Sequence, residues 1–134
     1  MCIRDRYRRV PSFRVLIVDD EPDIVESISA MLQATVPGVT TIAAADGMKA
    51  LAIIEAEPVD LILSDYKMPN MDGIEFLTRA KELLPETPRL LITAFPDPKL
   101  AARAVREAGV GLFVAKPFDV AYIAEVLKAF APDD

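Results

Sequence analysis

The sequence predicts an α/β fold in which one parallel β-sheet is covered by helices on both faces. Short apolar runs recur along the 134 residues, and each is followed by a segment with helical periodicity. The strongest runs do not alternate apolar with polar residues, which indicates strands buried on both faces. Strands that alternate with helices favour a parallel sheet with crossover helices. We therefore expect a doubly wound (βα)5 architecture in a single domain, since this length suits one domain.

Five runs are predicted to be strands. Four of them are wholly apolar, at residues 15–18, 61–63, 90–92 and 112–114. The fifth, at 39–43, contains two threonines and is more polar, which suggests a strand nearer the edge of the sheet.

Between these runs, apolar residues recur at helical spacing. Segments 48–56 and 73–84 carry short patterns of this kind, and three further stripes are each predicted to share one helix face. The stripes comprise Ile24, Ile28, Met31 and Leu32; Leu100, Ala104, Val105 and Ala108; and Val120, Ile123, Leu127 and Phe130.

Helix boundaries agree with this periodicity. Asp72 is placed to cap a helix, with Glu75 completing a capping box. Asp97, which precedes a proline, and Asp119 are placed to begin two later helices. Gly109 is placed to end the helix before the last strand.

The composition excludes several kinds of chemistry. Histidine is absent, so histidine triads, histidine-ligated zinc and an internal phosphohistidine are excluded. The one cysteine, Cys2, excludes a thiolate metal cluster and an internal disulfide. Any metal must be a hard cation held by oxygen ligands, for which Mg2+ is the main candidate and Mn2+ the alternative.

Charge divides the chain into a short basic leader and an acidic domain. Residues 1–9 hold four arginines and one aspartate, and the remaining 125 residues carry 11 basic and 20 acidic side chains. We expect 1–11 to be a disordered or non-native leader, 12–131 the domain, and 132–134 a tail. The acidic domain is not expected to bind nucleic acid directly. Since neither a signal peptide nor a membrane-spanning run is found, a cytoplasmic location is expected.

Polar residues follow four of the predicted strands. Asp19 and Asp20 end the first strand, Asp65 the third, Thr93 the fourth and Lys116 the fifth. Ligands of open α/β sheets bind at the carboxyl ends of the strands, so these side chains should converge at one edge. Without a cation, the carboxylates would repel one another.

These residue types suit phosphoryl transfer. Asp20 and Asp65 are expected to bind the metal directly, and Asp19 directly or through water. Asp65 is the expected nucleophile, because aspartate can carry a phosphoryl group and this one stands alone on a central strand. Lys116 would neutralise charge on the phosphoryl oxygens, and Thr93 would donate a hydrogen bond to one of them.

The chain resembles the receiver domain of two-component response regulators over residues 12–131. The likeness rests on the polar residues at the strand ends and on the loop MPNMDG at 68–73. Those residues are Asp19, Asp20, Asp65, Thr93 and Lys116, the last followed by Pro117. The resemblance implies a flavodoxin-like three-layer sandwich with strand order 2-1-3-4-5.

The resemblance also implies a phosphorelay role. A histidine kinase or phosphotransfer protein would supply phosphohistidine, and the chain would catalyse only its own phosphorylation and dephosphorylation at Asp65. The backbone carbonyl of Lys67 would complete the metal ligands, and Lys116-Pro117 would be a cis peptide. Thr93 and Phe113 would form the switch. Phe113 stands where relatives often carry tyrosine, so switching would work by packing.

Two further expectations follow from the resemblance. Phe95, two residues after Thr93, is expected to shield the acyl phosphate from water. The surface formed by the helix at 99–108, the strand around Phe113 and the last helix is expected to bind partners or a second copy. Arg103 and Arg106 would add charge to that surface.

Each residue also has a plainer interpretation. Acidic residues after the first strand favour a helix N-terminus, aspartate favours turns, and threonine favours strands. Lysine is ordinarily solvated at the surface. Phe113, Leu100, Ala104 and Val105 are first read as core residues.

Other functions fit less well. An interaction or scaffold module that keeps the fold without phosphorylation stays the alternative. A phosphohydrolase with an aspartate nucleophile would need a second acid where Lys67 stands. A phosphate-cradling loop for FMN is replaced by the acidic DDEPD, and no P-loop motif is present.

Overall fold

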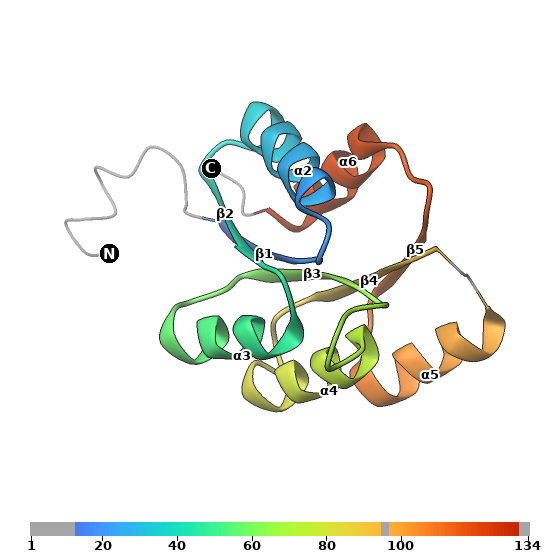
Figure 1. Ribbon diagram of the computed structural model, residues 1–134. Coiled ribbons are helices and arrows are strands. Elements are labelled where there is room, and N and C mark those ends of the chain that lie inside the picture. The colour runs from blue at the N-terminus through green and yellow to red at the C-terminus, as the bar shows by residue number, and fades with distance from the viewer. Residues whose placement is uncertain (1–12, 95–96, 132–134) are drawn as a thin grey trace.

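The computed structural model describes residues 13–94 and 97–131. Strands and helices alternate along the chain (Figure 1). The strands are β1 (Phe13–Val18), β2 (Val39–Ala44), β3 (Leu61–Asp65), β4 (Arg89–Thr93) and β5 (Leu112–Ala115). The helices are α2 (Pro22–Thr35), α3 (Gly47–Ala56), α4 (Gly73–Leu83), α5 (Pro98–Ala108) and α6 (Val120–Phe130). The predicted leader, the tail at 132–134 and Phe95 lie outside the described residues.

The five strands form one parallel sheet in the order β2-β1-β3-β4-β5, as expected. The predicted edge position of β2 is therefore confirmed. The register brings Val18 beside Ser64, Asp65 beside Ile92, and Thr93 beside Ala115. The carboxyl ends of the central strands consequently lie at one edge of the sheet.

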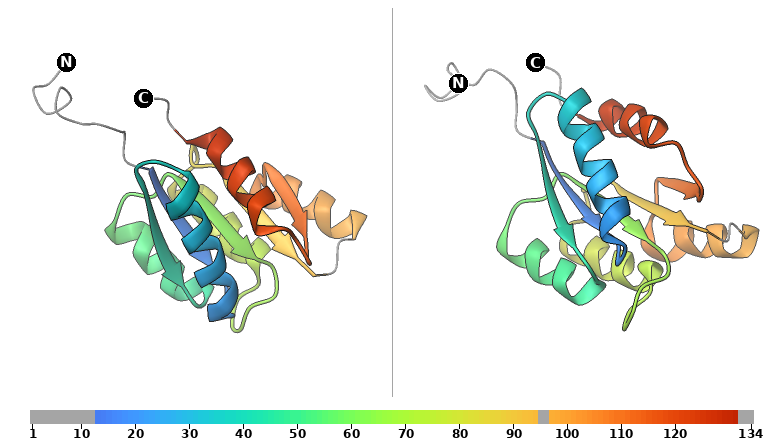
Figure 2. Two further views of the ribbon diagram at one scale, coloured as in Figure 1. Left: turned by 90° about the horizontal axis from the view of Figure 1, so that it is seen from above. Right: turned by 45° about the horizontal axis from the view of Figure 1, so that its top comes forward.

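Helices cover both faces of the sheet, and each face has its own hydrophobic core. Helices α2 and α6 lie side by side on one face, while α3, α4 and α5 cover the other (Figures 1 and 2). The first core includes Ile28, Leu32, Ile123 and Leu127, and the second includes Ala104. No helix in the described part of the chain has the length and apolar character needed to span a membrane.

Two residues of the predicted apolar stripes, Val105 and Phe130, are exposed and do not belong to the core. Ala104 and Ala108 are buried on α5, but Val105 is 59% exposed. One step along a helix turns the side chain by about 100°, so Val105 leaves the line that Ala104 and Ala108 direct inward. Phe130, in the last turn of α6, is also exposed.

The predicted helix boundaries are confirmed. The side chains of Asp72, Asp97 and Asp119 each accept a hydrogen bond from a backbone N–H in the first turn of α4, α5 and α6. Gly109 ends α5 in the left-handed conformation, with φ of 61°. One hydrogen bond of the predicted capping box is formed, from the N–H of Glu75 to Asp72 Oδ1 at 2.8 Å. The Glu75 carboxylate accepts instead from Arg79 Nη2, at 3.0 Å.

A buried arginine at the start of β4, Arg89, connects the C-terminal ends of two helices. Arg89 Nε donates to the carbonyl of Ala108 at 2.8 Å, and Nη1 donates to those of Leu84 and Thr87 at 3.1 and 2.8 Å. Nη2 lies 3.5 Å from the carbonyl of Gly109. Burial lowers the pKa of Arg89. The guanidinium therefore links the C-terminal ends of α4 and α5 to the start of β4.

Candidate phosphoacceptor and metal site

The structure brings the predicted site residues together at the carboxyl edge of the sheet. Asp19 follows β1 directly, Asp65 and Thr93 are the last residues of β3 and β4, and Lys116 follows β5. Asp19, Asp65 and Thr93 are buried, whereas Asp20 is exposed. Three buried polar side chains and the partly buried Lys116, gathered from the ends of four strands, point to a functional site rather than to solvated loops.

A pocket of about 530 Å³ opens over these residues. Its polar lining comes from the carboxyl ends of β1, β3, β4 and β5 and the loops that follow them. The lining includes Asp20, Glu21, Asp65, Lys67, Thr93 and Lys116. Lys67 therefore lies at the pocket, as expected.

Lys116 is the centre of charge in the site. Its Nζ lies 3.3 Å from Asp65 Oδ1, 3.5 Å from Asp19 Oδ2 and 3.3 Å from Glu21 Oε1. Burial lowers the pKa of Lys116, but the charges of Asp65 and Asp19 outweigh this, so that the pKa is raised. The ammonium group is therefore firmly protonated, and it is not the solvated surface charge of the plainer interpretation.

Backbone amides orient the two buried carboxylates. Asp19 Oδ1 accepts from the N–H of Glu21 at 2.9 Å, and Asp65 Oδ1 accepts from the N–H of Tyr66 at 3.0 Å. The pKa of Asp65 is raised to about 6, chiefly by burial and then by the charge of Asp19, against the opposing effect of Lys116. Burial also raises the pKa of Asp19. One lysine thus does not fully compensate the buried negative charge.

The donor set fits a hard divalent cation. Asp19, Asp20, Glu21 and Asp65 each offer a carboxylate oxygen, and these oxygens lie within 4.8 Å of one another. Carboxylate oxygens are the ligands that Mg2+ and Mn2+ prefer. A divalent ion would also offset the excess negative charge described above.

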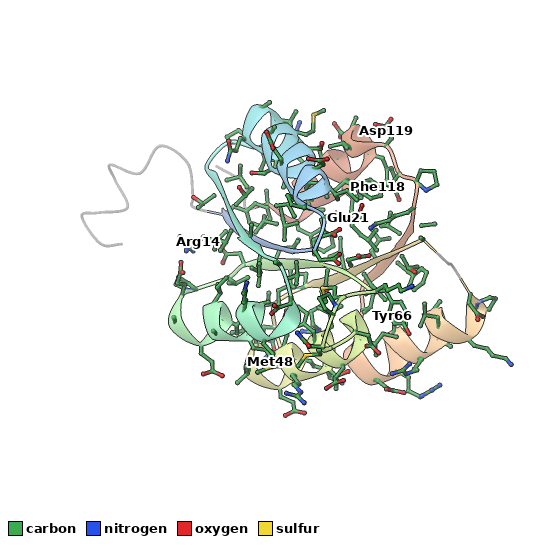
Figure 3. All side chains as sticks on the ribbon, in the orientation of Figure 1. Arg14, Glu21, Met48, Tyr66, Phe118 and Asp119 are labelled. Carbon is green, nitrogen blue, oxygen red and sulfur yellow. The ribbon has the colours of Figure 1, made fainter. Side chains whose placement is uncertain are left out.

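Glu21 is the residue that sequence reasoning missed. It directly precedes α2, so its charge was explained by the helix N-terminus, although its side chain makes no capping hydrogen bond. Its carboxylate instead lies beside Lys116, near the carboxyl edge of the sheet (Figure 3). The run of acidic residues at 19–21 was the available signal.

The expected switch residues lie on one face of the sheet. Phe113 pairs in register with Leu91, and Thr93 lies two residues farther along the same strand as Leu91. Phe113 is partly buried and packs against the core that includes Leu91 and Ala104. The Lys116-Pro117 peptide is cis, as expected.

The expected partner surface carries exposed apolar residues and internally paired charges. Val105 on α5 and Tyr122 on α6 are 59% and 51% exposed. Arg103 Nε lies 3.3 Å from Glu107 Oε1, and Arg106 Nη2 lies 3.8 Å from Glu107 Oε2. Both arginines therefore already have an acidic neighbour on α5.

Comparison with known sequences identifies relatives of matching length and of greater length. The sequence model of the family described as response regulator receiver domain matches residues 15–128. Sporulation initiation phosphotransferase F of Bacillus subtilis is 34% identical over 119 residues, covering 89% of this chain and 94% of the relative. Regulatory protein AtoC of Escherichia coli is 36% identical over 107 residues, covering 80% of this chain but 23% of the relative. The chain spans a similar fraction, 21%, of the hydrogenase transcriptional regulator HoxA of Cupriavidus necator.

Solved structures show the same likeness. The signal receiver domain of an HD domain-containing protein from Pseudomonas fluorescens has a TM-score of 0.82 and 30% identity, covering 89% of this chain and 94% of that one. Chemotaxis protein CheY4 of Vibrio cholerae has a TM-score of 0.80 and 31% identity, covering 90% and 99%.

Proposed function

This chain belongs to the response regulator receiver family, and from that premise we propose that it accepts a phosphoryl group on Asp65. The donor would be a histidine kinase or a histidine phosphotransfer protein of a two-component system. The observation that carries the proposal is the buried Asp65 carboxylate, which lies 3.3 Å from Lys116 beside a cluster of further carboxylates. A carboxylate held next to one cation and open to a pocket is suited to attack phosphorus.

Phosphoryl transfer from the donor's phosphohistidine to Asp65 needs no further reactant. A carboxylate oxygen of Asp65 attacks phosphorus and forms the new O–P bond. The P–N bond of the donor's phosphohistidine breaks, and its electron pair stays on the imidazole nitrogen. Lys116 holds positive charge beside the oxygen atoms of the transferred group, and we assign Thr93 as a hydrogen-bond donor to them. Hydrolysis of the acyl phosphate returns Asp65 to its carboxylate form.

We assign the metal site to Asp19, Asp20 and Asp65 with the backbone carbonyl of Lys67. When bound, Mg2+ or Mn2+ would supply positive charge that neutralises the phosphoryl oxygens and screens the carboxylates from one another. The raised pKa of Asp65, caused first by burial, supports the need for that charge.

The response to phosphorylation is proposed to travel from Thr93 to Phe113. Their position on one sheet face supports a packing change that reaches α5 and β5, and we propose that the surface continues onto the neighbouring α6. Val105 and Tyr122 make that surface suitable for a partner or a second copy, because exposed large apolar side chains are typical of interfaces. A cytoplasmic location and the domain limits 12–131 stay predictions.

Mass spectrometry of the intact protein tests the proposal. With Mg2+ and a small acyl phosphate donor, the protein should gain the mass of one phosphoryl group, and peptide mapping should place it on Asp65. Asp65→Asn should gain none, whereas Asp60→Asn, which directly precedes β3 at the opposite, amino edge of the sheet, should behave as the parent does. Unchanged mass in the parent with both this donor and a phosphorylated kinase would favour the scaffold alternative.

A further inference from the structure

Lys116 has three acidic neighbours that are held in place very differently. The side chains of Asp19 and Asp65 are 3% and 7% exposed, and each accepts a hydrogen bond from a backbone amide. The side chain of Glu21 is 60% exposed. Asp19 and Asp65 are therefore fixed within the site, whereas Glu21 approaches Lys116 from the solvent-exposed side.

The contact between Glu21 and Lys116 joins two distant parts of the sequence. Glu21 Oε1 lies 3.3 Å from Nζ, and the two residues are 95 positions apart in the sequence. The glutamate does not cap α2 with its side chain, so this position at the helix start does not explain its orientation. In Figure 3 Glu21 lies where the loop after β1 reaches the carboxyl edge of the sheet.

A phosphoryl group on Asp65 would increase the number of anionic oxygens that surround the ammonium group of Lys116. Its anionic oxygens would enter the pocket that Glu21, Asp65 and Lys116 line together. An ammonium group has three N–H donors, so it cannot direct one at each carboxylate and also at the new oxygens. The neighbour that leaves at the smallest cost is Glu21, since an exposed carboxylate regains water when its ion pair breaks.

We propose that Glu21 is an exchangeable counter-ion of Lys116, which occupies the ammonium group before transfer and gives it up to the phosphoryl oxygens afterwards. The second half of this proposal rests on the proposed phosphorylation of Asp65. Glu21 is a positioning residue in this scheme, because it acts through Lys116 and does not touch the reacting atoms.

Three variants separate contact from charge. Glu21→Gln removes the charge, and Glu21→Asp keeps it but withdraws the carboxylate by about 1.5 Å, the length of one C–C bond. Glu26→Gln is the matched control, since Glu26 is exposed as Glu21 is, lies in the first turns of α2, and lines a neighbouring pocket without Lys116. The parent and the three variants are compared at the same Mg2+ concentration and under otherwise identical conditions.

The first measurement follows the Lys116 side chain by NMR in lysine-labelled protein, with assignment through Lys116→Arg. Before phosphorylation, the Lys116 signals should shift in Glu21→Gln and Glu21→Asp but not in Glu26→Gln. After phosphorylation, the Lys116 signals of the parent and of both Glu21 variants should converge. A residue with a merely structural role would not produce that convergence.

The second measurement is the second-order rate constant for phosphorylation by a small acyl phosphate at saturating Mg2+. Release of Lys116 should raise it about two- to fivefold in both Glu21 variants, the factor expected of an exposed ion pair. Glu26→Gln should stay close to the parent.

Each contrary result has a distinct meaning. If Glu21→Asp matches the parent while Glu21→Gln is faster, repulsion at a distance is responsible and the exchange is wrong. If Mg2+ affinity falls in Glu21→Gln while the Lys116 signals stay unchanged, Glu21 is a metal ligand and the exchange is again wrong. If the parent takes up no phosphoryl group, the proposed function fails and the exchange fails with it.

Discussion

Replacing Asp65, the proposed phosphoacceptor, should stabilise the protein when no divalent cation is present. Asp65 is 6% exposed, and its pKa is raised to about 6, first by burial and then by the charge of Asp19. The ionised carboxylate is therefore held in an unfavourable environment at neutral pH. Asp65→Asn keeps the shape of the side chain and an oxygen that can accept from Tyr66, but it removes the charge.

The size of the effect follows from the pKa. A shift from 3.8 to about 6 corresponds to roughly 3 kcal/mol of free energy at neutral pH. Lys116 loses one of its acidic neighbours in the variant, which offsets part of the gain. We expect the free energy of unfolding of Asp65→Asn to exceed that of the parent by about 1–3 kcal/mol at pH 7.5.

The raised pKa of Asp65 also determines how the free energy of unfolding changes with pH. Because the folded-state pKa lies above the unfolded one, the folded protein binds more protons between about pH 4 and pH 6. The contribution of Asp65 to stability is thus complete below the unfolded pKa and is lost as the pH rises through about 6. This loss should be absent in Asp65→Asn. Saturating Mg2+ should raise the stability of the parent at pH 7.5 and narrow the difference.

Urea unfolding with and without Mg2+ measures these differences between pH 4 and 8. Asp20→Asn removes the same charge from an exposed position in the same pocket, so its gain without Mg2+ should be less than about 1 kcal/mol. An Asp65→Asn variant that is less stable than the parent at pH 7.5 without Mg2+ would refute the reasoning. So would an unchanged loss of stability between pH 4 and 6.

Two further predictions concern stability. Arg89→Met should lower the free energy of unfolding by about 2–4 kcal/mol in urea denaturation, because it removes the donor to the buried carbonyl of Ala108 and to the part-buried carbonyl of Thr87. Arg79→Met, at an exposed pair, should cost less than about 1 kcal/mol. Equal effects would show that Arg89 is not a buried clamp. Gly73→Ala should cost about 2–3 kcal/mol in the same assay, because a Cβ there would collide with the carbonyl oxygen of Asp65. Gly111→Ala, whose Cβ would be 3.9 Å from its nearest neighbour, is the control, and a similar loss there would contradict this packing argument.

The fold and most of the site could be predicted because they depend on local patterns. A strand of consecutive apolar residues followed by an amphipathic helix requires nothing from distant sequence to be recognised. Parallel order then brings the residue after each strand to one edge, which is why Asp65, Thr93 and Lys116 could be placed together. Helix caps such as Asp119 have equally local signals.

The remaining features depend on contacts between distant segments. Glu21 and Lys116 are 95 positions apart and are brought together by the fold, whereas the place of Glu21 at a helix start offered a sufficient local explanation. Val105 continues an apolar pattern, but the direction in which α5 packs leaves it exposed. Arg89 has no sequence signal for burial, because its partners are carbonyl groups and not acidic side chains.

Because Arg89 donates to backbone carbonyl groups, its hydrogen bonds depend little on which side chains stand at the partner positions. Every amino acid supplies the same oxygen, so exchanges at the partly buried Leu84 and Thr87 can leave the arginine's hydrogen bonds in place, whereas Ala108 is also confined by its burial in the core. Gly109 is the exception, since a Cβ there would lie 2.8 Å from the guanidinium and the backbone has a positive φ. Substitutions can therefore accumulate around this anchor while its two fixed points, one arginine and one glycine, stay the same.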